Sequence, residues 1–146
     1  METERLIQDL IERTKNNINQ AEKFKQINIE ILNSRIEEGS WSILECIEHL
    51  NLYGDFYIPE ITNRINSSKT SPSKNFNSGV LGNYFAKSML PKKKLNKMKT
   101  FKVMNPMGSK LEKNTIDRFL FQQSQILDLL DKSNTVNLNK TKTSIS

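Results

Sequence analysis

Residue types that build chemical sites are scarce in this chain. Its 146 residues include one cysteine, one histidine and one tryptophan. A single cysteine excludes an intrachain disulfide and a cysteine-rich metal site. No apolar run approaches the roughly 20 residues of a transmembrane helix, and the polar, acidic N-terminus lacks the apolar stretch of a signal peptide. We therefore expect one cytoplasmic domain over residues 1–146, with no membrane association.

Acidic residues are missing from the middle of the chain. Residues 1–60 hold 6 Lys and Arg against 12 Asp and Glu, whereas residues 61–111 hold 11 Lys and Arg and no acidic residue. A basic block of this kind is either solvated or attracted to the acidic part of its own domain, or it attracts an anionic ligand or nucleic acid. Its lysines from Lys87 to Lys102 alternate with apolar residues, a pattern that phosphate-binding segments share. Solvated loops are the commoner outcome, so we do not expect a nucleic-acid partner.

Apolar residues recur with helical spacing in three long segments, and this periodicity predicts an all-α fold. The predicted helices cover residues 2–36, 42–67 and 114–132. Gly39 suits the left-handed conformation that ends the first of them. Pro59 lies inside the second helix and should kink it, because proline removes one helical hydrogen bond.

The connection between the second and third long helices is irregular and long. It spans residues 67–114, with one short helix predicted from Val80 to Met89, and a polar tail without helical period follows Ser133. Three amphipathic helices leave an apolar stripe that a fourth helix would cover. We therefore predict an up-down bundle that lacks its last helix and forms a homodimer through the exposed stripes.

The start of the second helix, residues 41–50, carries the most specific motif. Ser42 followed by Glu45 is a capping box, in which each side chain bonds a backbone N–H of the first turn. His49, the only histidine, titrates near neutral pH when unperturbed. Cys46 shares its helical face with His49. A Cys–His pair can form a nucleophile, but a cysteine here is more often a small buried hydrophobe.

The run Trp41-Ser42, Glu45, His49-Leu50 resembles the start of the second helix in the DinB/YfiT-like family of helical-bundle proteins. The resemblance extends through residues 119–123 to residues 137–140. In this family the matching histidine is one of three that hold a divalent metal, so the resemblance implies that His49 is a ligand of Zn²⁺ or Ni²⁺. It also implies a DinB-like bundle with the long irregular connection already predicted. Family members continue into a helix with a His-x-x-x-His motif, so we expect this chain to be C-terminally incomplete.

The resemblance implies a metal-dependent enzyme, a thiol S-transferase or a hydrolase. The metal would lower the pKa of a bound thiol or water, and a small anionic thiol would be the substrate. A catalytic site of this kind needs three protein ligands around an open position. Only His49 is present, so the chain is expected to be inactive, and no catalytic residue is assigned. The alternative function is a non-catalytic helical interaction module that self-associates through its exposed apolar stripes.

Overall fold

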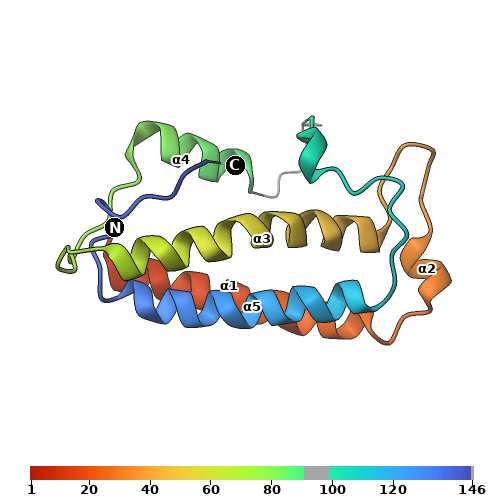
Figure 1. Cartoon of the computed structure of the whole chain (residues 1–146), viewed down its shortest axis with the longest axis horizontal. Helices are drawn as coiled ribbons and strands as arrows, with labels where there is room; N and C mark the ends of the chain where they lie inside the picture. Colours follow the sequence, from red (N-terminus) through yellow and green to blue (C-terminus); the bar gives the residue numbers. More distant parts are fainter. Residues whose placement is uncertain (91–98, 146) are drawn as a thin grey trace.

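The computed structural model describes residues 1–90 and 99–145. Within these ranges the chain is all-α, as predicted, and an isolated bridge between Glu2 and Asn75 is its sole β pairing (Figure 1). The elements are α1 (Thr3–Phe24), α2 (Ile29–Asn33), α3 (Ile43–Ser67), α4 (Gly79–Ser88), the 3-10 helix η1 (Lys102–Met104) and α5 (Asn114–Ser133). Among the described helices, none combines the length and apolarity needed to cross a bilayer.

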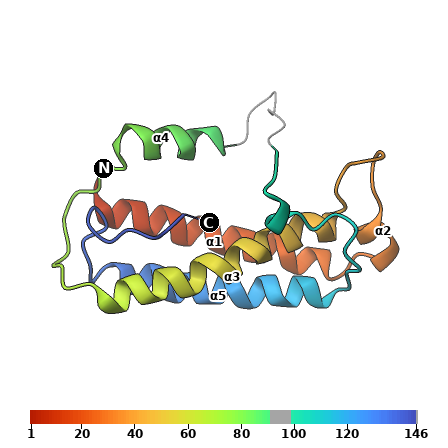
Figure 2. The same ribbon diagram turned by 45° about the horizontal axis from the view of Figure 1, so that its top comes forward.

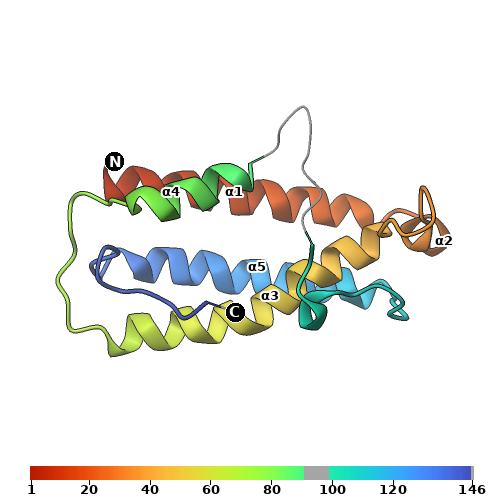
Figure 3. The same ribbon diagram turned by 90° about the horizontal axis from the view of Figure 1, so that it is seen from above.

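The three long helices form the body of the molecule. α5 packs against both α1 and α3, and from above its ribbon lies between those of α1 and α3 (Figure 3). The main core lies where these helices meet the α2 end of the bundle. It consists of Ala21, Leu32, Leu44, Ile47, Ile116 and Phe119. Burial of these side chains is the main source of stability, because the hydrophobic effect scales with the apolar area removed from water.

The predicted single helix over residues 2–36 is wrong beyond Phe24. The chain turns over residues 25–28, and the Asn28 side chain accepts a hydrogen bond from the Glu30 N–H (2.8 Å) to begin α2. Leu32 is nevertheless fully buried in the core, so the apolar period continues across a turn that interrupts the helix. Gly39 has a φ of 80°, as predicted, but it lies in the turn before α3 rather than at a helix end.

The bounds predicted for the later helices are confirmed. α3 has Ser42 as its N-cap and continues through Pro59, and α4 and α5 lie where the sequence places them. Helical spacing predicts an apolar stripe along α3 that includes Ile47 and Leu50. Ile47 is buried as this stripe predicts, but Leu50 is 51% exposed while Asn51 is fully buried. The Asn51 amide donates to the Thr115 carbonyl oxygen (3.0 Å) at the start of α5, and this bond offsets part of the cost of burying a polar side chain.

The segment before α4 is tied to both ends of the chain. The Thr3 N–H donates to the Lys74 carbonyl (2.9 Å), and the Phe76 N–H donates to the Met1 carbonyl (2.8 Å). The Asn77 N–H donates to Oδ1 of Asn139 (2.8 Å) in the C-terminal tail. α4 itself has no buried residue and stands away from the three long helices (Figure 2). Much of the predicted basic segment, Lys92, Lys93, Lys94, Leu95, Lys97 and Met98, lies outside the described residues.

Candidate functional site

Glu45 joins three segments of the chain at the start of α3. The capping box is present: the Glu45 N–H donates to Oγ of Ser42 (3.1 Å), and the Ser42 N–H donates to Oε2 of Glu45 (2.9 Å). The Arg35 guanidinium and the Gly108 N–H (3.2 Å) also donate to this buried carboxylate. The bond from Arg35 is the main reason that the pKa of Glu45 lies below its ordinary value, with help from the backbone N–H groups of Ser42 and Gly108. These bonds occupy both oxygens, so Glu45 is a structural anchor and not a metal ligand.

His49 lies half-buried one turn further along α3. Its ring contacts those of Trp41 and Tyr53, with centroids 4.8 and 5.0 Å away. Its Nδ1–H donates to the Met104 carbonyl oxygen in η1 (2.7 Å). From its helical face His49 is predicted to point toward the bundle interior, whereas the structure places it against η1 and outside the core cluster. Metal-ligating histidines usually donate their second ring N–H to such an acceptor, so Nε2 is the nitrogen left for a ligand.

The neighbours of His49 do not form a nucleophile with it. Cys46 is exposed, so the expectation of a buried hydrophobe is wrong. Partial desolvation of its thiol raises its pKa, and the adjacent Glu45 carboxylate raises it further, whereas a nucleophilic cysteine needs a lowered pKa. The Glu48 carboxylate accepts hydrogen bonds from Arg118 (2.9 and 3.0 Å) and from Asn51 (3.2 Å).

The side chains around His49 do not complete the metal centre that the resemblance implies. Across residues 1–90 and 99–145, no three His, Cys, Asp or Glu side chains are grouped so that they could hold an ion. His49 offers one imidazole nitrogen, and the carboxylates beside it are bonded to arginines. A catalytic site with three protein ligands is therefore not present in this part of the chain, and no metal-dependent step is assigned to it.

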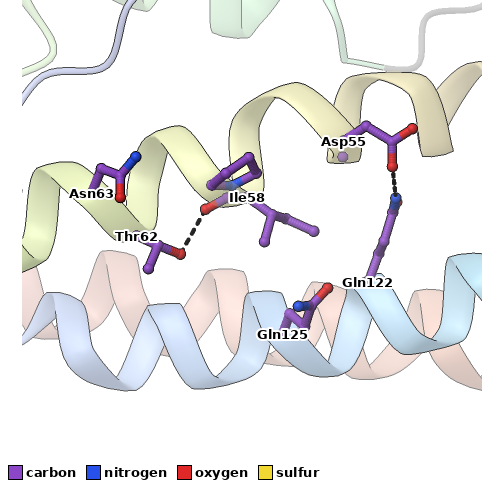
Figure 4. A pocket seen from close by; sticks show the side chains of 8 residues that line it. Asp55, Ile58, Thr62, Asn63, Gln122 and Gln125 are labelled. Carbon is purple, nitrogen blue, oxygen red and sulfur yellow. Dashed lines mark hydrogen bonds between the residues drawn. The ribbon is translucent and has the colours of Figure 1, made fainter.

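Polar side chains fasten α3 to α5 on one side of the bundle. Arg118 pairs with both Glu48 and Asp55. The Gln122 amide donates to the Asn51 carbonyl (3.1 Å) and to Oδ1 of Asp55 (2.9 Å). An open pocket of about 360 Å³ lies on this side, and Figure 4 shows Asp55 and Gln122 bonded to each other at its edge. The Asp55 carboxylate is held by Gln122 and Arg118, so it is not free to bind a ligand in this pocket.

An apolar groove also lies along α3 and α5, and it shares Gly54, Ile58 and Gln122 with the first pocket. Its volume is about 270 Å³. It is lined by Asn17 of α1, by Leu50, Tyr53, Gly54, Tyr57, Ile58 and Ile61 of α3, and by Phe119, Gln122, Gln123 and Ile126 of α5. Tyr53, which lines the groove, also contacts the His49 ring. Helical spacing along the sequence places Leu50, Tyr57 and Ile61 on the main apolar stripe of this helix, and in the structure they form one wall of this groove.

The structure brings the sequence-predicted His49 next to residues that sequence reasoning missed. Met104 is 55 positions away and offers only its backbone carbonyl, so no side-chain motif could reveal it. Gly108 likewise reaches Glu45 through a backbone N–H. No family model, curated protein or solved structure matches this chain.

Proposed function

We propose that the chain is a metal-dependent enzyme of the DinB/YfiT-like type, a thiol S-transferase or hydrolase acting on a small anionic thiol, with His49 as one metal ligand. The supporting observation is the bond from Nδ1 of His49 to the Met104 carbonyl (2.7 Å), which orients the ring and leaves Nε2 for an ion. The described residues supply one ligand of the three that such a centre needs. The chain alone is therefore proposed to be inactive, with the other ligands supplied from outside these residues.

The sole tryptophan gives a direct test of metal binding by His49. Trp41 lies 4.8 Å from the His49 ring, so Ni²⁺ bound at the imidazole should quench its fluorescence. We expect weak, saturable quenching that His49→Ala removes and the matched control Cys46→Ser retains, because one imidazole is one ligand. Equal quenching in His49→Ala would show that His49 is not the metal ligand.

An added C-terminal helix tests the missing ligands. A helix with two histidines one turn apart should raise Zn²⁺ or Ni²⁺ affinity by orders of magnitude, because three nitrogens then share one ion. His49→Ala in this extended chain should abolish the gain. Metal content after dialysis and titration calorimetry measure the effect. If the extended chain holds metal equally well without His49, the assignment of this residue is wrong.

The groove supports a second candidate function, a helical interaction module. Its walls are apolar and aromatic, and Leu50 at its edge is 51% exposed. Exposed apolar surface with a polar rim is typical of protein interaction sites. An apolar fluorescent dye, anilinonaphthalene sulfonate, should bind here, and Leu50→Asp should reduce its signal several-fold. The control Phe121→Asp changes an exposed side chain of α5 outside the groove, so dye binding that both variants reduce equally would contradict an apolar site in the groove.

A further inference from the structure

Gln123 of α5 carries a buried amide that the described part of the chain leaves unpaired. The residue is 8% exposed and lines the apolar groove. Across residues 1–90 and 99–145, no hydrogen bond reaches its side chain. Burying an amide without a hydrogen-bond partner costs free energy, and buried polar side chains are therefore nearly always bonded. A molecule that binds in the groove and supplies the partner would explain this exception.

The preceding residue shows that the same helix can satisfy a buried amide. Gln122 is also buried, and its Nε2 donates to the Asn51 carbonyl (3.1 Å) and to Oδ1 of Asp55 (2.9 Å). Successive side chains of a helix point about 100° apart, and Gln123 takes no part in these bonds. Its amide therefore remains available to a molecule in the groove.

The size and lining of the groove suit a small neutral molecule. Its volume of about 270 Å³ lies just below the usual range for ligand pockets, about 300–1,000 Å³. None of the described residues that line it is charged, and Tyr53, Tyr57 and Phe119 contribute aromatic rings. Ligand pockets are typically apolar and aromatic, with a few polar groups that fix the orientation of the ligand. Leu50 at the edge is 51% exposed, so a small molecule can enter from solvent on this side.

The amide of Gln123 selects the polar group of such a ligand. A glutamine side chain offers an N–H donor and a carbonyl acceptor next to each other. A carboxamide or a lactam offers the complementary acceptor and donor, so it can form two hydrogen bonds with this side chain. A carboxylate has acceptors alone, and among uncharged lining residues its charge would be buried without a partner. The ligand is therefore expected to be neutral and to contain an amide.

We infer that the groove binds a small, mainly aromatic molecule whose carboxamide or lactam group pairs with the side-chain amide of Gln123. The site is built from residues of α1, α3 and α5. It goes beyond both candidate functions, because its ligand is neither a metal ion nor a protein partner. It also does not depend on metal binding by His49.

Three probes that share one ring test the site: benzamide, methyl benzoate and benzoate. Methyl benzoate can accept but cannot donate a hydrogen bond, and benzoate is charged. Dissociation constants measured by ligand-observed nuclear magnetic resonance should show benzamide binding at least fivefold more tightly than either of the others. Equal affinities for the three probes, or no binding of benzamide, would overturn the inference.

Gln123→Met tests the role of the amide, because methionine retains the length of the side chain and removes its hydrogen-bonding groups. The preference for benzamide should be lost in this variant. The matched control Gln125→Met lies on the same helix, where Gln125 lines the other pocket, and should retain the preference. A preference that survives in Gln123→Met would overturn the inference.

Urea unfolding distinguishes an amide kept for a ligand from one that stabilises the fold. Gln123→Met should raise the urea midpoint, because it removes a buried polar group without a partner. A lower midpoint would show that the amide is bonded within the chain and would overturn the inference. A groove occupied by a second copy of the chain would overturn it too, and in that case benzamide would bind more weakly as the protein concentration rises.

Discussion

Glu45 shows how one side chain connects segments that are far apart in sequence. It caps α3 locally through Ser42, and it receives hydrogen bonds from Arg35 before the helix and from Gly108 after η1. Only the local half of this arrangement is a sequence motif. The carboxylate is 3% exposed, and a buried charge is stable only when it is paired and hydrogen-bonded. The conformation of two loops therefore depends on its ionisation.

Stability should depend on pH through Glu45. Its pKa in the folded state lies below the ordinary value of 4.5, so its stabilising effect is complete above that value and is lost as the pH falls through the folded pKa. We expect Glu45→Gln to lower the free energy of unfolding by about 2 kcal/mol at neutral pH, and the difference from the parent to shrink below pH 4.5. Urea unfolding at several pH values measures this. The exposed control Glu38→Gln should follow the parent, and a constant difference down to the acid transition would contradict the role of Glu45.

In α3, too, some features follow from the local sequence and others depend on tertiary contacts. Its bounds follow from the Ser42 cap and from its apolar period, which are local features. The predicted buried face is only partly right, because Ile47 of the predicted stripe lies in the core whereas Leu50 faces the groove and Asn51 faces α5. That choice depends on where α5 packs, and a helical period alone specifies a stripe without its partner. The sequence around Gly54 likewise does not indicate that α5 packs there, yet the absence of a side chain at Gly54 leaves room for Gln122 of α5.

Gly54→Ala should destabilise the protein although alanine is the better helix former. A Cβ at this position would lie 2.1 Å from Oε1 of Gln122, and that side chain is held by Asn51 and Asp55. We expect the free energy of unfolding to fall by about 1–3 kcal/mol, measured by urea unfolding. In Gly54→Ala/Gln122→Ala the clash is absent, so the two effects should be less than additive. Strict additivity would show that the contact is not the cause.

At the scale of the whole molecule, charge is distributed unevenly along one small bundle. The net charge of +6 combines an acidic start with a middle that lacks acidic residues. All four acidic side chains of α3 are paired with arginines: Glu45 with Arg35, Glu48 and Asp55 with Arg118, and Glu60 with Arg64. The net positive charge of the chain therefore comes from the basic residues of its middle segment.

Nucleic-acid binding should be weak and steeply dependent on salt. A generic DNA duplex is attracted to the lysines by counterion release, which weakens as salt rises. We expect measurable affinity at low salt and little at about 0.15 M salt, where charges more than about 8 Å apart are screened. Fluorescence anisotropy of a labelled duplex measures this. Tight binding that persists at the higher salt would contradict this prediction and would indicate that nucleic acid is a partner of this protein.

The sequence alone determined the helical class, the start of α3 and the position of its one histidine. Caps and periodicity arise from neighbours within a few residues, so they can be read along the chain. The break after Phe24, the bond from His49 to Met104 and the groove were decided by tertiary structure. Each depends on segments far apart in sequence, which meet only when burying the apolar stripes brings α1, α3 and α5 together. For the same reason Ile47 of the predicted α3 stripe lies in the core, whereas Leu50, Tyr57 and Ile61 form one wall of an open groove.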